Sequence, residues 1–162
     1  MPHIESIVYQ PKKSAQPNGS VDFVRVPLEQ ATLIADHGID GDRKAGHNQT
    51  RQLNLLSREW LDSVRPLGYR TGPGQFGEQI IVAGLAIERL APGARLMLGD
   101  EAIIEITKGR TGCSRLEAAQ GQSIAGIGHI GVLARVIAGG TIRVGDPVAV
   151  LEPVSAATAS SQ

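Results

Sequence analysis

Residues 95–107 read RLMLGDEAIIEIT, and residues 130–151 read IGVLARVIAGGTIRVGDPVAVL. Both stretches consist of short runs rich in β-branched side chains, and glycine, proline or aspartate bounds each run, a pattern that predicts strands joined by tight turns. Glycine and aspartate separate two runs at Gly99-Asp100 and again at Gly145-Asp146, and Gly139-Gly140 offers the positive φ that two-residue hairpin turns require. Strands this short and this numerous favour a closed barrel, because closure removes exposed strand edges.

The same pattern extends over the rest of the chain. Strands are predicted over the runs Ile4–Tyr9, Val21–Val26, Ala31–Ala35, Gln52–Leu56, Gln79–Val82, Arg95–Leu98, Ala102–Thr107, Ile130–Ala138, Thr141–Val144 and Val148–Leu151. Ser57 can cap a helix over Arg58–Arg65, and a second helix is possible at Arg115–Gln120. We therefore expect a mainly β fold, a closed β-barrel of short, largely antiparallel strands with a few short helices.

The chain length is that of one ordinary domain, which we place at residues 1–151. Residues 152–162 read EPVSAATASSQ and carry little that could pack, so we expect a disordered C-terminal tail.

The composition excludes several classes of function. Among the 162 residues, 16 Lys and Arg stand against 16 Asp and Glu, so no overall positive field attracts nucleic acid or anionic lipid. Aromatic residues make up 3% of the chain, which is too few to stack single-stranded nucleic acid. The N-terminal MPHIESIVYQPKKS does not resemble a signal peptide, and no apolar run reaches the roughly 20 residues that span a bilayer. We expect a cytoplasmic protein with no membrane or nucleic-acid partner, and a single cysteine fits a reducing compartment.

That cysteine, Cys113, has the most distinctive surroundings in the sequence. It lies in KGRTGCSR, residues 108–115, directly after the predicted strand Ala102–Thr107. A lone cysteine is more often a buried small hydrophobe than a nucleophile, but no apolar residue precedes Cys113 within four positions, and Arg110 and Arg115 lie within three. Positive charge and a following helix favour the thiolate, which is the nucleophilic and metal-binding form. Thiolate sulfur also suits softer transition metals better than magnesium or calcium.

Two further polar stretches are candidates for a site. GIDGDRKAGH, residues 38–47, belongs to a polar loop that is longer than compact domains usually carry without a function, although it could equally be a solvated loop held by its own ion pairs. GQFGE, residues 74–78, places Glu78 before a predicted strand, where a turn with a surface glutamate is the plainer interpretation. His47 and His129 lack partners at metal-ligand spacing, and we interpret both as loop residues.

Taken in order, a series of short motifs resembles the molybdenum cofactor sulfurase C-terminal (MOSC) domain family. The motifs are Gly41-Asp42-Arg43, RQLNLL at residues 51–56, Phe76-Gly77-Glu78, Gly84-Leu85, Leu98-Gly99-Asp100, Lys108–Cys113, Gly131–Val136 and Gly139–Asp146. Each is short, but their order and the place of the one cysteine are those of the family, over about residues 36 to 150. The resemblance implies a strand-rich barrel of the stand-alone bacterial type that binds the molybdenum cofactor (molybdopterin).

The resemblance also implies roles for individual residues. Cys113 would ligate molybdenum or carry a persulfide sulfur destined for it, and Glu78 would donate a proton or orient the cofactor. The residues that would bind the cofactor are Asp42, Arg43, Arg51, Gly77, Lys108, Arg110 and Arg115. Because molybdopterin carries a phosphate and a dithiolene, the bases among these residues, together with Lys44, would form a cationic pocket if their loops converge at one end of the barrel.

The chain departs from the family pattern at two positions. Family members commonly have asparagine where this chain has Gln79, which keeps an amide, and proline where it has Gly112. Proline fixes φ and presets the cysteine loop, whereas glycine leaves that loop more freedom.

Three functions stay open at this point. An enzyme would transfer sulfur to the cofactor or carry out redox chemistry at it, and would need a pyridoxal-phosphate desulfurase or a redox partner, since 162 residues leave no room for either module. A non-catalytic module would store or carry the cofactor. A degenerate barrel would bind another anion or a protein partner.

Overall fold

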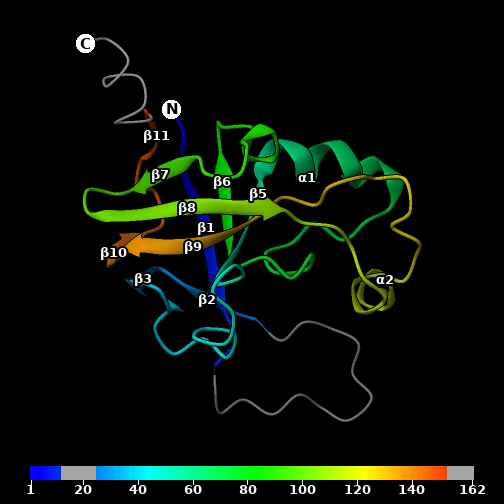
Figure 1. The fold of residues 1–162 in the computed structure, drawn as a ribbon. Helices are drawn as coiled ribbons and strands as arrows, with labels where there is room; N and C mark the ends of the chain where they lie inside the picture. Colours follow the sequence, from blue (N-terminus) through cyan, green and yellow to red (C-terminus); the bar gives the residue numbers. More distant parts are fainter. Residues whose placement is uncertain (12–24, 153–162) are drawn as a thin grey trace.

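The computed structural model describes residues 1–11 and 25–152, and all structural statements concern these residues. The strands are β1 (His3–Tyr9), β2 (Val26–Leu28), β3 (Gln30–Ile34), β4 (Gly38–Ile39), β5 (Leu53–Ser57), β6 (Ile80–Ala83), β7 (Arg95–Leu98), β8 (Ala102–Gly109), β9 (Val132–Ala138), β10 (Gly140–Arg143) and β11 (Val148–Leu151). The helices are α1 (Arg58–Val64) and α2 (Ser114–Gln120), with short 3-10 helices η1 (Arg65–Leu67) and η2 (Ile87–Arg89) (Figure 1). The predicted mainly β fold with a few short helices is confirmed.

The strands form two sheets. Eight strands make one sheet in the order β11-β7-β8-β9-β5-β6-β1-β2, and β10-β3-β4 make a second. Every strand pair is antiparallel except β5 with β6, which run parallel because α1 carries the chain back between them. The prediction of largely antiparallel pairing is therefore confirmed.

The predicted closed barrel is not confirmed. Strands β11 and β2 form the two ends of the eight-stranded sheet. Backbone hydrogen bonds join β1 to the turn before β11, where the Ile4 N–H donates to the Asp146 carbonyl at 2.9 Å and the Gly145 N–H donates to the Ile4 carbonyl at 2.7 Å. Because β1 continues from there as a partner of β6 and β2, while β11 turns away to pair with β7, the two strands meet only at their ends among the described residues.

The main hydrophobic core lies between the sheets. In β8 the buried side chains Ala102, Ile104 and Ile106 alternate with half-buried ones, as expected for a strand with one face in the core. All residues of β5 and β6 are buried, because these central strands are covered on both faces. The strand order thus places the most apolar segments in the middle of the large sheet.

A second, smaller core lies against the helices. It consists of Leu56, Leu61, Val64, Phe76, Ile81, Leu116 and Ile130, with Trp60, Tyr69, Ile124 and Ile127 packed against it. The rings of Trp60 and Phe76 meet edge to face, with centroids 5.2 Å apart. Leu116 of α2 is fully buried here, so this cluster, which we call the helix-side core, anchors the helix that follows Cys113.

Most predicted local elements are confirmed. β7 and β11 have the predicted bounds, and Ser57 caps α1 by accepting a hydrogen bond from the Trp60 N–H at 3.0 Å. Gly99 and Gly145, which lie in the predicted Gly-Asp turns, have a positive φ. Of the predicted strand Val21–Val26, only Val26 begins β2, while residues 21–24 and the predicted tail from residue 153 onward lie outside the described residues.

The prediction of a hairpin turn at Gly139-Gly140 is wrong. Strand β9 pairs with β8 and β5, whereas β10 crosses to the second sheet and pairs with β3. Neither glycine has a positive φ, and a Cβ at Gly139 would lie 2.6 Å from the Leu33 carbonyl oxygen. Glycine is needed at position 139 for this close approach between sheets rather than for a turn.

No helix among residues 1–11 and 25–152 combines the length and the apolar character needed to cross a membrane.

Candidate functional site

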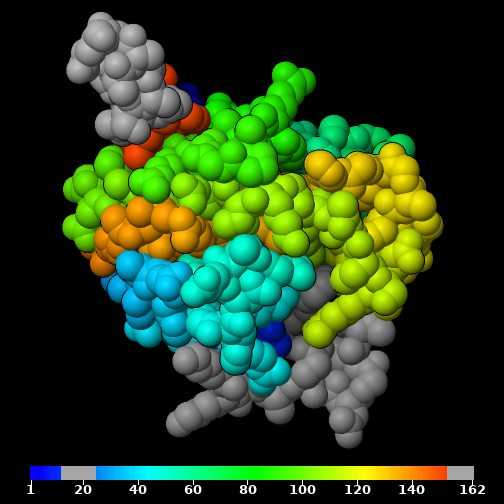
Figure 2. Space-filling model, viewed as in Figure 1, coloured from blue at the N-terminus to red at the C-terminus, as the bar shows by residue number. Residues whose placement is uncertain are grey.

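Two loop regions that are distant in the sequence face each other across a hollow. Figure 2 shows the loop at residues 40–50 in cyan and the segment leading into α2 in yellow-green on the same side of the molecule. A cavity of about 410 Å³, which we call the first pocket, is lined by Arg43, Lys44, His47, Asn48, Arg51 and Asn54. A second pocket of about 290 Å³ is lined by Arg51, Lys108, Gly109, Arg110, Thr111 and Leu133. Arg51 lines both pockets, so they form adjoining parts of one basic region.

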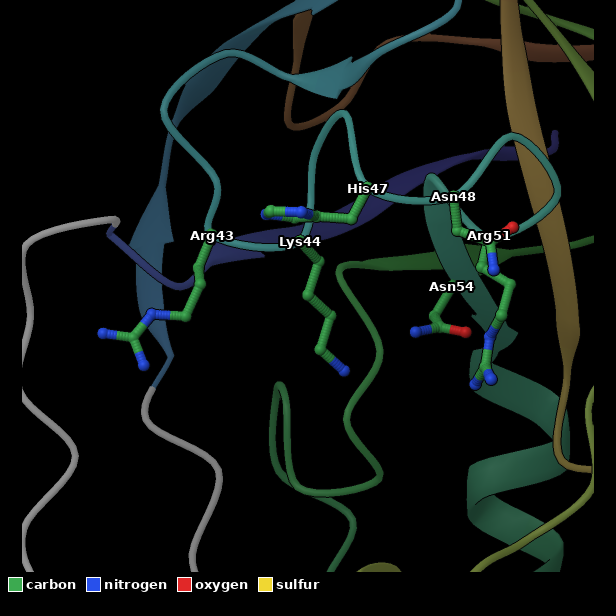
Figure 3. A pocket seen from close by; sticks show the side chains of 6 residues that line it. All are labelled: Arg43, Lys44, His47, Asn48, Arg51 and Asn54. Carbon is green, nitrogen blue, oxygen red and sulfur yellow. The ribbon is translucent and has the colours of Figure 1, made fainter.

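The basic side chains of this region are close enough to affect one another. The pKa of Lys44 is lowered from 10.5 to about 8. Desolvation is the largest cause of this shift, and the positive charges of four guanidinium groups contribute the smaller part. These groups belong to Arg25, Arg51, Arg110 and Arg115. Lys44 keeps contact with solvent, but its side chain extends over the first pocket beside Asn54 and Arg51, where protein atoms displace part of its water (Figure 3). We call Lys44 and the four arginines the cationic cluster.

Arg110 connects the cluster to the cysteine. Its side chain is 7% exposed and donates a hydrogen bond to the Phe76 carbonyl at 2.5 Å. Burial lowers the pKa of Arg110, while the negative charges of Glu78 and Cys113 act in the opposite direction. Cys113 therefore lies within electrostatic range of Arg110, and Arg110 lies within range of Lys44.

Cys113 itself is exposed at the start of α2. It has extended backbone angles as the N-cap residue of that helix, and its carbonyl accepts the Glu117 N–H at 3.1 Å. It lines a third pocket of about 290 Å³ together with Gly112, Ser114, Glu117, Ile124 and Ala125. An exposed thiol within electrostatic range of a buried guanidinium can attack or coordinate a molecule from the solvent.

Gly112 lies close to side chains of the helix-side core. A Cβ at position 112 would lie 1.8 Å from Ile124 Cδ1 and 3.2 Å from Ile130 Cδ1. The φ of Gly112 is not positive, so the backbone does not demand glycine there. The side chain of Ile124 fills the space that a larger side chain at position 112 would need. This packing limits the freedom that glycine gives to the loop before Cys113.

Two acidic residues of the sequence motifs lie beneath the pocket, bonded to protein. Asp42 is 1% exposed and accepts the Gln10 N–H at 2.9 Å and Gln79 Nε2 at 3.1 Å. Glu78 is also 1% exposed and accepts the N–H groups of Gly74 at 2.5 Å and Phe76 at 3.1 Å.

Burial raises the pKa of Glu78, although its backbone hydrogen bonds and Arg110 oppose the shift. Glu78 holds the turn at residues 74–78 and does not line any of the three pockets described above.

The structure brings most of the predicted site residues together. Arg43, Lys44 and Arg51 line the first pocket, Lys108 and Arg110 line the second, and Arg115 acts on Lys44 electrostatically. Asp42, Gly77 and Glu78 lie in the layer underneath. In Figure 3 the guanidinium of Arg43 points away from the side chains of Lys44 and Arg51.

Two residues of the region were missed from the sequence. Arg25 hydrogen-bonds Gln10 Oε1 at 3.0 Å and the Gly77 carbonyl at 3.4 Å, and no motif contains it. Asn54 is a buried amide between Leu53 and Leu55 in β5, and a polar residue within such an apolar run is a sequence signal for a special role. Among the described residues, no group of three or more His, Cys, Asp and Glu could hold a metal ion.

Comparison with known proteins assigns the chain to a family. The sequence pattern of the MOSC domain matches residues 40–149, which is more than half of the chain, so the protein belongs to the MOSC domain family. No curated protein matches the sequence.

Several solved structures share the fold at low sequence identity. YiiM from Geobacillus stearothermophilus is 20% identical with a TM-score of 0.68, over 94% of this chain and 76% of that one. YiiM from Escherichia coli is 23% identical with a TM-score of 0.63, over 95% and 71%. The YuaD protein from Bacillus subtilis is 20% identical with a TM-score of 0.69, over 91% and 94%.

Proposed function

We propose that this protein binds the molybdenum cofactor, an anionic molybdopterin, in the cationic region and acts on its metal or sulfur through Cys113. The observation that carries the proposal is that basic side chains from separate segments of the chain line two adjoining pockets, with Lys44 and Arg51 in the first and Arg51 and Arg110 in the second. The carboxylates beneath the cluster, Asp42 and Glu78, are buried and bonded to amides, so the outward charge of the region is positive.

The chemistry of these side chains fits the cofactor. Arginine and lysine bind phosphate through charge-assisted hydrogen bonds, and Arg51 is placed to serve both pockets. When bound, the cofactor would supply a redox-active molybdenum centre with soft sulfur ligands. Cys113 would supply a thiolate to that region, since it is exposed and within electrostatic range of Arg110.

Sulfur transfer is the first of two roles for Cys113. The Cys113 thiolate would attack the outer sulfur of a persulfide on a desulfurase, so that a new S–S bond forms at Cys113 and the donor cysteine leaves as a thiolate. No oxidant is needed, because the sulfane sulfur is exchanged between two thiols. Such a protein would work in the cytoplasm beside a pyridoxal-phosphate desulfurase or, if Cys113 ligates the metal instead, beside a redox protein.

Intact-mass analysis distinguishes these roles. The protein is incubated with a cysteine desulfurase and cysteine, and Cys113→Ser serves as the matched control. The mass of one added sulfur on the wild type, absent from Cys113→Ser, supports the carrier role. No added sulfur, together with molybdenum that copurifies with the wild type and is lost from Cys113→Ser, supports ligation.

The same measurements test a non-catalytic carrier. Stoichiometric molybdenum that survives in Cys113→Ser would mean that the pocket stores the cofactor without using the thiol. If neither added sulfur nor molybdenum is found in protein from cells that make excess cofactor, the proposal is wrong and a different anion or a protein partner occupies the region.

A further inference from the structure

The amide oxygen of Asn54 is a buried acceptor without a hydrogen-bond partner among the described residues. The residue is 5% exposed and lines the first pocket, and its amide lies between the side chains of Lys44 and Arg51 (Figure 3). A buried acceptor left without a donor costs about 1 to 3 kcal/mol. Because Asn54 lines a cavity, a ligand that reaches this oxygen could provide the missing donor.

The direction of the amide is set by the layer beneath the pocket. Asn54 Nδ2 donates to the Gly77 carbonyl at 3.4 Å, and turning the amide over would instead place two oxygens against each other. The backbone on both sides is held by Gln79, whose Oε1 accepts the Asn54 N–H at 2.7 Å and whose N–H donates to the Asn54 carbonyl at 3.0 Å. Asp42 in turn accepts Gln79 Nε2 at 3.1 Å. These contacts therefore hold the amide with Oδ1 on the side of Arg51, which also lines the first pocket (Figure 3).

Arg51 covers the oxygen without being fixed there. Figure 3 shows the Asn54 oxygen turned toward the Arg51 side chain, which is exposed. The backbone N–H of Arg51 donates to the Asn48 carbonyl at 3.3 Å, but no hydrogen bond or ion pair joins its side chain to another described residue. An anion that binds the guanidinium can therefore draw it outward and uncover the acceptor.

We infer that Asn54 Oδ1 accepts a hydrogen bond from a ring N–H or amino group of the ligand, so that the pocket selects anions that also carry such a donor. An anion alone would satisfy the cationic cluster and leave the Asn54 oxygen without a partner. A ligand with a negative charge and an N–H donor would satisfy both the cationic cluster and the Asn54 oxygen. Asn54 would therefore determine specificity, while the charged residues provide the attraction. The inference rests on the proposed anion-binding function, because Lys44 and Arg51 provide the charge that brings the ligand in.

Two acids of equal charge and similar size provide the test. Pterin-6-carboxylate carries N–H donors on its double ring, whereas naphthalene-2-carboxylate has a double ring and no N–H donor. Isothermal titration calorimetry of the full chain measures the affinity for each acid. We expect the wild type to prefer the pterin acid by about tenfold, the effect of one hydrogen bond to a buried acceptor.

The variants separate Asn54 from the charged residues. Asn54→Leu is expected to reduce the preference to within about twofold, because no acceptor remains. Asn54→Asp keeps an acceptor oxygen and is expected to retain a preference for the pterin acid, which keeps the inference testable if Asn54→Leu does not fold. Arg51→Gln is expected to weaken binding of both acids by a similar factor and to leave the preference in place.

Each outcome bears on one of the two ideas. Equal affinities of the wild type for both acids, or an unchanged preference in Asn54→Leu, would overturn the role of Asn54. The anion pocket would still stand in that case, provided that Arg51→Gln weakens both acids. If neither acid binds the wild type, the inference and the proposed anion pocket are both wrong.

Discussion

Lys44 should make anion binding depend on pH in a range where most lysines do not titrate. Its pKa is lowered to about 8, first by desolvation and then by the arginines around it. An anion interacts with the protonated form, so affinity should fall as the pH rises through 8. At about pH 9.5 a group with this pKa is only about 3% protonated, so the affinity should be lower than at about pH 7 by up to about 30-fold.

Sulfate is a suitable probe, because it stays a dianion throughout this range. Calorimetric titration of the wild type with sulfate is compared with Lys44→Arg, whose guanidinium stays charged. Lys44→Arg should keep its affinity for sulfate between about pH 7 and 9.5, apart from pH effects of other groups that it shares with the wild type. A wild type whose affinity does not change with pH, or a variant that loses affinity in parallel with it, would refute the assignment of the effect to Lys44.

The lowered pKa of Lys44 changes stability with pH in the direction opposite to its effect on anion affinity. The folded pKa of Lys44 lies below its unfolded value of 10.5, so between about 8 and 10.5 the unfolded chain binds more protons than the folded one. The free energy of unfolding of the wild type should therefore rise with pH in this window relative to Lys44→Arg. Solvent screening at this exposed side chain will reduce the size of the rise, and urea unfolding at a series of pH values measures it.

Two further predictions concern the packing that supports the site. Gly112→Ala should lower the free energy of unfolding by about 1 to 3 kcal/mol, because the new Cβ would clash with Ile124. Adding Ile124→Ala should recover part of this loss. A double variant no more stable than Gly112→Ala would contradict the clash as the reason. Ser57→Ala should lower the free energy of unfolding, measured with urea, by about 1 to 2 kcal/mol. The Ser57 hydroxyl accepts the Trp60 N–H at the start of α1 and donates to Glu88 at 2.9 Å. An unchanged urea midpoint would show that this cap does not stabilise the protein.

The local elements could be predicted from the sequence, while the pairing of strands could not. Runs of β-branched residues and turn glycines are local signals, and they located β7 and β11 correctly. Nothing local distinguishes β10, which crosses to the second sheet, from a strand that turns back on β9. The open ends at β11 and β2 have the same origin, because closure depends on contacts between residues far apart in the sequence.

The charged part of the site was also predictable, in contrast to the layer under it. Arginine and lysine in motif loops indicated a basic pocket, and Arg51 and Arg110 lie there. Asp42 was expected to contact a ligand, but it is buried and bonded to Gln79. Whether a carboxylate faces a ligand or supports a loop depends on its tertiary partners, which a motif does not contain.

The loop before Cys113 shows the same limit. Gly112 was interpreted from the sequence as a source of freedom in the cysteine loop. The partner that restrains it, Ile124, lies beyond α2, and only the folded chain places the two in contact.

The edge-to-face contact in the helix-side core gives this protein a built-in optical reporter. Trp60 is the one tryptophan of the chain, so its fluorescence is not mixed with that of any other indole. It packs on Phe76, whose carbonyl holds the guanidinium of Arg110. A ligand that binds Arg110 and shifts its side chain would disturb the contact between Trp60 and Phe76. The tryptophan emission of the native protein would then report occupancy of the pocket in real time, without an attached dye.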